Sequence, residues 1–280
     1  MVTARAAVLG HPIGHSLSPV LHNAAYAHLG LTDWSYQAVD CTEAGFADWF
    51  RGLGPDWRGL SLTMPLKRVV IPMLSRVSPL ARTVGAVNTV TWDGDRLSVG
   101  HNTDVHGIVA ALRSVGVGGV GSACILGAGA TACSAVAALA ELGCDTVLLQ
   151  ARSPERAAAA LAVADRLGLR AAVGGLDDVP AAVGAEVLIA TLPPVAATEW
   201  ATGLPGQFLK RGADKPAGVL LDVSYHPWPT AAAAAWTQAG GVAVGGFEML
   251  LHQAAAQVTL MTGEPAPIEA MRRAGELALR

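Results

Sequence analysis

Short apolar runs alternate with amphipathic stretches in the first part of the chain. Such runs predict buried strands, and apolar positions at helical spacing predict the helices between them. The expected strands are 4–9, 34–39 and 59–63, followed by a hairpin of 88–92 and 96–100 around Asp93-Gly94-Asp95, and the expected helices are 20–29 and 46–53. Gly30 is a natural stop for the first helix.

From Asp104 the pattern becomes a regular alternation of strands and helices. The expected strands are 122–126, 145–150, 187–190 and 219–223, and the expected helices are 104–115, an alanine-rich helix ending near 143, and 153–167. This order indicates an α/β fold with a parallel, doubly wound sheet. We place a domain boundary near residue 103 and expect the helical segment 247–280 to pack back on the first domain.

The composition indicates a folded chain without a basic footprint. Its 280 residues are 52% apolar, and 19 basic against 22 acidic residues give a formal charge of −3. We therefore expect no nucleic-acid partner. The stretch 114–140 lacks charged residues, but glycines interrupt it, which favours a buried strand, turn and helix over a membrane span.

The cysteines and the first residues bear on the compartment. None of Cys41, Cys124, Cys133 and Cys144 stands in a C-x-x-C spacing, so we expect buried thiols and a reducing compartment. The apolar run after Met1 is too short for a signal peptide. We expect a cytoplasmic protein without a membrane partner.

A glycine-rich turn suggests a nucleotide site. The run Gly127-Ala128-Gly129-Ala130-Thr131-Ala132 fits G-x-G-x-x-G/A, follows an expected strand and opens an expected helix. Small residues there let the backbone approach a pyrophosphate, whose charge the helix N-terminus stabilises. The alternative is close helix–sheet packing. We favour a Rossmann-type dinucleotide-binding domain over 104–246.

The end of the following strand suggests which dinucleotide binds. An NAD site usually has an acidic residue there, whereas this chain has Ala151-Arg152-Ser153, with Arg156 in the next turn. An arginine can pair bidentately with a 2′-phosphate. The alternative is two solvated charges, but cations at a helix N-terminus are mildly unfavourable. We therefore expect NADP.

Several blocks of residues resemble the shikimate dehydrogenase family, in the family's order and over nearly the whole chain. The blocks are Gly10-His11-Pro12-Ile13-Gly14-His15-Ser16-Leu17-Ser18-Pro19-Val20-Leu21-His22-Asn23, Thr63-Met64-Pro65-Leu66-Lys67, Gly85-Ala86-Val87-Asn88-Thr89, Asn102-Thr103-Asp104, Asp222-Val223-Ser224-Tyr225-His226-Pro227 and Gly246-Phe247-Glu248-Met249-Leu250-Leu251-His252-Gln253-Ala254. The resemblance implies NADPH-linked reduction of 3-dehydroshikimate to shikimate in aromatic amino acid biosynthesis.

The resemblance also implies roles for individual residues. Ser16 and Ser18 match the serines that hold the substrate carboxylate, and Lys67 and Asp104 match the catalytic pair that exchanges the hydroxyl proton. The other residues matched to substrate binding are Thr63, Asn88, Asp104, Tyr225 and Gln253, and Lys67 is matched to substrate binding as well. The residues matched to cofactor binding, besides the glycine turn and those named in 151–156, are Thr191, Val223 and Gly246. Residues 1–103 plus 247–280 would then form the substrate-binding catalytic domain.

Two blocks depart from the family's pattern. Ser61 stands where the family commonly has Asn, so a hydroxyl replaces an amide. The family's third loop often reads N-A-T-x-x-G, whereas this chain has Ala190-Thr191-Leu192-Pro193-Pro194. Cofactor contacts in that loop are therefore expected from Thr191 alone.

Three alternatives stay open beside this interpretation. One is a quinate/shikimate dehydrogenase that uses NAD, and another is a catalytically silent nucleotide-binding paralogue. A third is a metal site at His11, His15 and His22, which we disfavour because Pro12 and Gly14 break the helix that would align the first two. We expect no metal, and the sequence leaves a monomer or a homodimer open.

Overall fold

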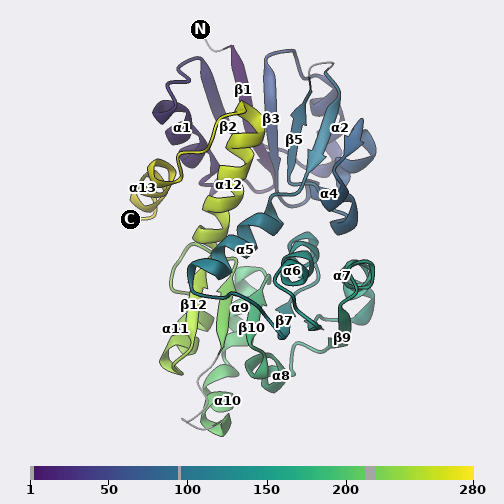
Figure 1. The fold of residues 1–280 in the computed structure, drawn as a ribbon, viewed down its shortest axis with the longest axis vertical. Helices are drawn as coiled ribbons and strands as arrows, with labels where there is room; N and C mark the ends of the chain where they lie inside the picture. Colours follow the sequence, from purple (N-terminus) through teal and green to yellow (C-terminus); the bar gives the residue numbers. More distant parts are fainter. Residues whose placement is uncertain (1–2, 94–95, 212–217) are drawn as a thin grey trace. The chain divides into compact units, whose positions relative to one another are not determined.

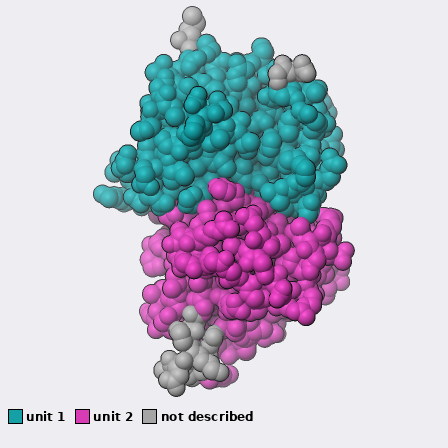
Figure 2. Space-filling model, in the orientation of Figure 1, with its two compact units in different colours: residues 1–103, 250–280 teal, residues 104–249 magenta. Residues whose placement is uncertain are grey.

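The computed structural model describes residues 3–93, 96–211 and 218–280. Two compact units divide the chain: unit 1 comprises 1–103 and 250–280, and unit 2 comprises 104–249 (Figure 2). Each unit is built on one six-stranded sheet. The expected α/β fold with parallel-rich sheets is confirmed.

Unit 1 holds the first sheet and the two C-terminal helices (Figure 1). Its strands are β1 (Ala4–Gly10), β2 (Trp34–Asp40), β3 (Trp57–Leu62), β4 (Arg76–Val77), β5 (Thr89–Trp92) and β6 (Ser98–His101). Its helices are α1 (Ser18–His28), α2 (Glu43–Arg51), α3 (Leu66–Val69), the 3-10 turn η1 (Ile71–Met73), α4 (Pro79–Val84), α12 (Gly246–Thr262, whose first residues belong to unit 2) and α13 (Ile268–Ala278).

The first sheet has the order β2-β1-β3-β5-β6-β4. Strands β2, β1 and β3 run parallel, whereas β5 runs antiparallel to both β3 and β6. The carboxyl ends of β1 and β3 and the amino end of β5 therefore meet at one edge of the sheet. The segments that carry Ser16, Ser18, Thr63, Lys67 and Asn88 adjoin that edge.

Both faces of the first sheet are covered, which explains why β1 is an almost continuous apolar run. Ala6 and Val8 pack on one face with residues of α1 and α12, and Ala7 and Leu9 pack on the other with residues of α2 and α3. This alternation follows from the two-residue period of a strand. The edge strand β2 is more exposed.

Unit 2 is the doubly wound half of the chain. Its strands are β7 (Ser122–Leu126), β8 (Thr146–Gln150), β9 (Arg170–Gly174), β10 (Val187–Ala190), β11 (Val219–Asp222) and β12 (Val242–Gly245). Its helices are α5 (Asp104–Ser114), α6 (Ala130–Glu141), α7 (Pro154–Leu167), α8 (Val179–Gly184), α9 (Pro194–Ala201), α10 (Leu204–Arg211) and α11 (Ala231–Gln238). All strand pairs are parallel in the order β12-β11-β10-β7-β8-β9.

The expected elements are present, with shifts of a few residues at their ends. The first helix begins at Ser18 and has Pro19 in its first turn, where proline is tolerated. Gly30, with a φ of +71°, lies just past the end of this helix. The hairpin arms β5 and β6 lie where they were expected, but Gly94 and Asp95 of the turn lie outside the described residues. The expected C-terminal helical segment is two helices, separated at Gly263, whose φ is +80°.

Candidate substrate and dinucleotide sites

The expected carboxylate-binding serines lie in the loop after β1 and at the start of α1. Ser18 is buried, and its backbone N–H donates to Ser16 Oγ at 3.3 Å. Ser16 is half-buried and, because its oxygen accepts this bond, keeps its own proton to donate. A hydrogen bond between His11 Nδ1 and Asp40 Oδ1, at 2.9 Å, anchors the loop after β1 to the end of β2.

Gly10 sets the spacing between the serine loop and Thr63. A Cβ on Gly10 would lie 2.3 Å from Thr63 Cγ2 and 2.7 Å from the Met64 carbonyl oxygen. The ends of β1 and β3 therefore approach more closely than any other residue would allow. The Thr63 N–H donates to the Leu9 carbonyl at 2.9 Å and closes this contact.

Lys67 follows the same strand end on the short helix α3. It is half-buried, and its carbonyl accepts from the Val87 N–H at 2.8 Å. This bond ties α3 to the segment that leads into Asn88. Lys67 and Asn88 thus start from neighbouring points of one sheet edge.

Asn88 is the centre of a buried polar cluster. Its Oδ1 accepts from the Thr103 N–H at 2.8 Å and from Thr89 Oγ1 at 2.9 Å. Its Nδ2 donates to Thr103 Oγ1 at 2.9 Å and to Gln253 Oε1 at 3.3 Å. Two of the expected substrate residues, Asn88 and Gln253, therefore touch, although they are far apart in the sequence.

Asp104 follows this cluster directly in the chain. Thr103 is bonded to Asn88 by both its backbone and its hydroxyl, and Asp104 is the next residue and the first of α5. The Asp104 side chain is buried, at 4% exposure. A buried carboxylate needs polar or charged partners, which suits a residue with a function.

The expected nucleotide residues lie at the carboxyl edge of the second sheet. Gly127 to Thr131 follow β7, Ala151 to Ser153 follow β8, Thr191 follows β10, Val223 follows β11 and Gly246 follows β12. In open parallel sheets, ligands bind outside this edge. Arg152 and Arg156 are both exposed there, at the start of α7.

The glycine turn has the geometry that its sequence predicts. Gly127 has a φ of +107°, and a Cβ on it would lie 2.5 Å from Thr191 Oγ1. Gly129 is the N-cap of α6, is exposed, and would place a Cβ near no other atom. The turn therefore leaves open space in front of the first N–H groups of α6, as a pyrophosphate requires.

Gly246 holds two neighbouring strand ends together. Its N–H donates to the Ser224 carbonyl at 3.0 Å, and a Cβ would lie 2.0 Å from the Val223 carbonyl oxygen. Asp222 fixes the loop that carries half-buried Tyr225, because its carboxylate accepts from the Ser224 N–H at 3.0 Å and from Thr230 Oγ1 at 2.8 Å.

Sequence reasoning missed Glu155 and the partners of Ser61. Glu155 lies in the first turn of α7 beside the expected phosphate-binding arginine, and the Ser153 hydroxyl lowers the pKa of its carboxyl. Ser61 is joined to Tyr36 and Gln257 by hydrogen bonds. Only the departure of Ser61 from the family's pattern marked it in advance.

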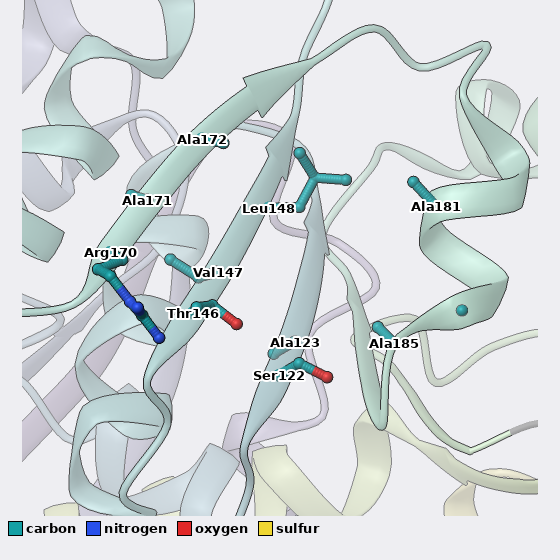
Figure 3. A pocket seen from close by; sticks show the side chains of 11 residues that line it. Ser122, Ala123, Thr146, Val147, Leu148, Arg170, Ala171, Ala172, Ala181 and Ala185 are labelled. Atoms are coloured by element: carbon teal, nitrogen blue, oxygen red, sulfur yellow. The ribbon is translucent and has the colours of Figure 1, made fainter.

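A hollow of 560 Å³ in unit 2 lies away from the expected nucleotide residues (Figure 3). Ser122, Thr146 and Arg170 line it, and each is the first residue of its strand. It opens beside α8, and Ala181 of that helix and Ala185, which follows it, flank the hollow. Because it lies toward the amino ends of the strands, it is not the nucleotide site.

The histidines proposed as an alternative metal site have other environments. His22 is fully buried and stacks on Tyr36, with 3.9 Å between the ring centroids. His11 pairs with Asp40. Within the described ranges, no three His, Cys, Asp or Glu side chains are grouped to hold a metal.

In the part of the chain that the structure describes, no helix is long and apolar enough to cross a bilayer.

The fold and the glycine turn together define a class: a two-unit α/β protein whose second unit is of the Rossmann type. Comparison with known proteins specifies it further. The family model for the shikimate dehydrogenase substrate binding domain matches residues 8–90, and that for the shikimate 5′-dehydrogenase C-terminal domain matches 246–274.

Relatives extend the match to nearly the whole chain. Shikimate dehydrogenase (NADP(+)) of Moorella thermoacetica is 36% identical over 97% of this chain and 92% of its own length. The crystal structure of Mycobacterium tuberculosis shikimate dehydrogenase is 41% identical, with a TM-score of 0.85 over 98% of this chain and 99% of that one. The Thermus thermophilus enzyme in complex with NADP(H) and shikimate is 33% identical, with a TM-score of 0.81 over 99% of this chain and 100% of that one. The chain belongs to the shikimate dehydrogenase family.

Proposed function

We propose that this chain catalyses the reversible, NADPH-linked reduction of 3-dehydroshikimate to shikimate in aromatic amino acid biosynthesis. One observation carries the proposal. Ser16, Ser18, Thr63, Lys67 and Asn88, which are matched to the carboxylate, the ring hydroxyls and proton transfer, adjoin one edge of the first sheet, and Gln253 of α12 is hydrogen-bonded to Asn88 there. The relative solved with NADP(H) and shikimate has the same fold over its whole length.

Ser16 and Ser18 would hold the substrate carboxylate. Hydroxyl donors bind a carboxylate without adding charge to a site that already contains Lys67. The resemblance gives the binding of the ring substituents to Thr63, Asn88, Asp104, Tyr225 and Gln253. Buried amides and hydroxyls suit this task because they select ligands that satisfy their hydrogen bonds.

Lys67 and Asp104 would move the proton. In the reductive direction a carbonyl oxygen becomes a hydroxyl oxygen, so it must receive one proton as the carbon receives a hydride. The Lys67 ammonium can give that proton, and Asp104 can orient the hydroxyl and keep the ammonium in place. In the reverse direction Lys67 takes the proton back.

The residues at the edge of the second sheet fit a dinucleotide. The space in front of Gly129 suits a pyrophosphate, and the exposed Arg152 guanidinium can pair with a 2′-phosphate. Ala128, Ala130, Thr131, Ala151, Ser153, Arg156, Thr191, Val223 and Gly246 would complete this site. NADPH, when bound, supplies the hydride, and the protein supplies position and electrostatics.

We assign residues 1–103 plus 247–280 to the substrate domain and 104–246 to the dinucleotide domain. This assignment is supported by the compact units, which divide at 103/104 and 249/250. We place the enzyme in the cytoplasm, as a monomer or homodimer without nucleic-acid or membrane partners. The small and slightly negative net charge supports the last point.

The test follows NADPH absorbance with 3-dehydroshikimate, and then NADP formation from shikimate in reverse. The expected result is turnover with both, with kcat/KM for NADP at least tenfold above that for NAD. Equal use of NAD, or faster turnover of quinate, would assign the chain to the quinate/shikimate alternative. Binding of NADP without turnover of any of these substrates would indicate a catalytically silent paralogue.

A further inference from the structure

A line of buried hydrogen bonds crosses unit 1 from Tyr36 to Asn88. Tyr36 Oη donates to Ser61 Oγ at 2.6 Å, and Ser61 Oγ donates to Gln257 Oε1 at 2.8 Å. Gln257 Nε2 then donates to Thr89 Oγ1 at 3.0 Å and to the Asn88 carbonyl at 3.3 Å. The line joins three strands and α12.

The Gln257 amide fixes the direction of the bonds toward Tyr36. Its Nε2 must face the Asn88 carbonyl, because a carbonyl can only accept, so its Oε1 must face Ser61. Ser61 has one proton and gives it to that oxygen. It can therefore only accept from Tyr36, and the Tyr36 proton is committed to Ser61.

The same amide fixes the bonds on the substrate side. Thr89 Oγ1 accepts from Gln257 and so gives its own proton to Asn88 Oδ1. This bond and the Thr103 N–H together hold Oδ1, which leaves Asn88 Nδ2 facing Gln253 Oε1 and the Thr103 hydroxyl. The Thr103 N–H, which can only donate, fixes the orientation of the Asn88 amide, and the Thr89 hydroxyl held by Gln257 supports the same orientation.

The other end of the line reaches the expected carboxylate site. Tyr36 Oη gives its proton to Ser61 and can then only accept, and the Ser18 side chain suits that role because it lowers the Tyr36 pKa, which burial raises. The Tyr36 ring stacks on His22, and His22 Nδ1 donates to the Ser18 carbonyl at 2.9 Å. Burial lowers the His22 pKa to about 4, so the ring is neutral at physiological pH.

Water cannot replace the bonds of this line. Tyr36 and Ser61 are each 4% exposed, Gln257 is 1% exposed and Thr89 is fully buried. Removing one partner in such a place leaves the other unsatisfied, which costs more than the bond itself contributes.

We propose that Tyr36, Ser61 and Gln257 are positioning residues that hold Ser18 and Asn88 at a fixed spacing and with fixed donor directions. The proposal rests on the proposed function, because it concerns a rigid ring that carries a carboxylate at one end and hydroxyls at the other. Ser61, which stands where the family commonly has Asn, then serves the site through Tyr36 and Gln257 and not by touching the substrate.

The main test compares Tyr36→Phe with Tyr26→Phe. Tyr26 is also buried and lies edge-on to His22, at 6.3 Å between centroids, but among the described residues its hydroxyl has no hydrogen-bond partner. We expect Tyr36→Phe to raise both the KM and the directly measured Kd for shikimate about three- to tenfold, as loss of one hydrogen bond implies. The kcat and the KM for NADP should stay within twofold, and Tyr26→Phe should match the wild type in every measurement.

Two further variants test how the line acts. In a Ser18→Ala background, Tyr36→Phe should change shikimate affinity by less than twofold, because the two residues act through one contact. Ser61→Ala should weaken shikimate binding at least as much as Tyr36→Phe, and Ser61→Thr, which keeps the hydroxyl, should restore it. If Ser61→Ala does not fold, the tyrosine pair decides, because each variant removes a single oxygen.

The outcomes separate this inference from the proposed function. A wild type that does not bind shikimate overturns both. Wild-type binding that Tyr36→Phe leaves within twofold of Tyr26→Phe overturns this inference alone. So does a Tyr36→Phe variant with a lower melting temperature and unchanged shikimate affinity, since Tyr36 would then be only structural.

Discussion

The candidate ligands at the edge of the first sheet are side chains, whereas those at the edge of the second sheet are mostly backbone groups. In unit 1, Ser18, Asn88 and Gln253 carry buried hydroxyl and amide groups, and the amides of Asn88 and Gln253 are oriented by hydrogen bonds. In unit 2, the glycine turn provides open space and the N–H groups of α6, and its charged side chains are exposed.

This difference matches what each site would recognise. A small ring with several oxygens is distinguished by the number and direction of its hydrogen bonds, so its site needs buried donors and acceptors. A pyrophosphate is recognised by charge and by close approach, which backbone N–H groups at a helix N-terminus provide. Apart from Asp104 and Tyr225, which belong to unit 2 but match substrate residues, substitutions in unit 1 should therefore change chemistry and substrate affinity, and those in unit 2 cofactor affinity and stability.

The largest expected effect is that of Lys67→Ala. Loss of a general acid–base group typically lowers the rate about 10²–10⁴-fold. We expect kcat to fall by this factor while shikimate and NADP still bind, as measured by steady-state kinetics and by titration. Arg68→Ala, the next residue and an exposed one, is the control and should keep the wild-type kcat.

A raised KM with unchanged kcat in Lys67→Ala would make Lys67 a binding residue, and the proton would have to move elsewhere. The site at the first sheet would then contribute only binding affinity, as the site at the second sheet does, and the contrast between the two sites would be smaller.

A second expected effect separates the charged part of the nucleotide site from its backbone part. Arg152→Asp removes a charge-assisted pair and places a carboxylate against the 2′-phosphate, so we expect kcat/KM for NADP to fall about a hundredfold. The value for NAD should change little, and Arg152→Ala should lie between. The control is Arg166→Asp, the same charge change about 20 Å away along α7.

A preference for NADP that survives Arg152→Asp would move the phosphate contact to Arg156. Glu155→Gln then becomes informative, because Glu155 is the acidic residue in that first turn. If the preference for NADP over NAD rises in Glu155→Gln, the Glu155 carboxylate weakens binding of the 2′-phosphate in the wild type. If use of NAD falls, the carboxylate serves the ribose hydroxyls.

The central strands and long helices of both units could be predicted from the sequence, since their apolar runs are long and end at glycine or proline. The short strands β4, β9 and β12 and the helices α3, α4 and α8 to α10 were missed. Arg76–Val77 is too short for any periodicity, and β9 and β12 are edge strands whose residues are partly exposed.

The candidate sites were predictable as motifs but not as hydrogen-bond networks. Nothing in the sequence pairs Ser61 with Gln257, which are 196 residues apart, because only the packing of α12 on the first sheet brings them together. The direction of each bond depends in turn on the Asn88 carbonyl, which no pattern of residue types reveals.

The smallest expected effect is in stability, and it tests whether the glycine turn works through its backbone. Gly127→Ala should lower the free energy of unfolding by about 1–3 kcal/mol, because a residue other than glycine is strained at positive φ. The new Cβ would also displace Thr191 Oγ1, which donates to the Leu126 carbonyl at 2.8 Å. Urea unfolding without cofactor measures this change.

Gly129→Ala is the matched control, because it adds the same atom two residues along the same turn. Its φ is −81° and no atom lies within 4 Å of the added Cβ, so its free energy of unfolding should equal that of the wild type. Its affinity for NADP should nevertheless fall, since the Cβ would occupy the space that the pyrophosphate needs. Gly127→Ala thus loses stability before any cofactor is added, and Gly129→Ala loses only binding. A stable Gly129→Ala that binds NADP as tightly as the wild type would place the pyrophosphate elsewhere.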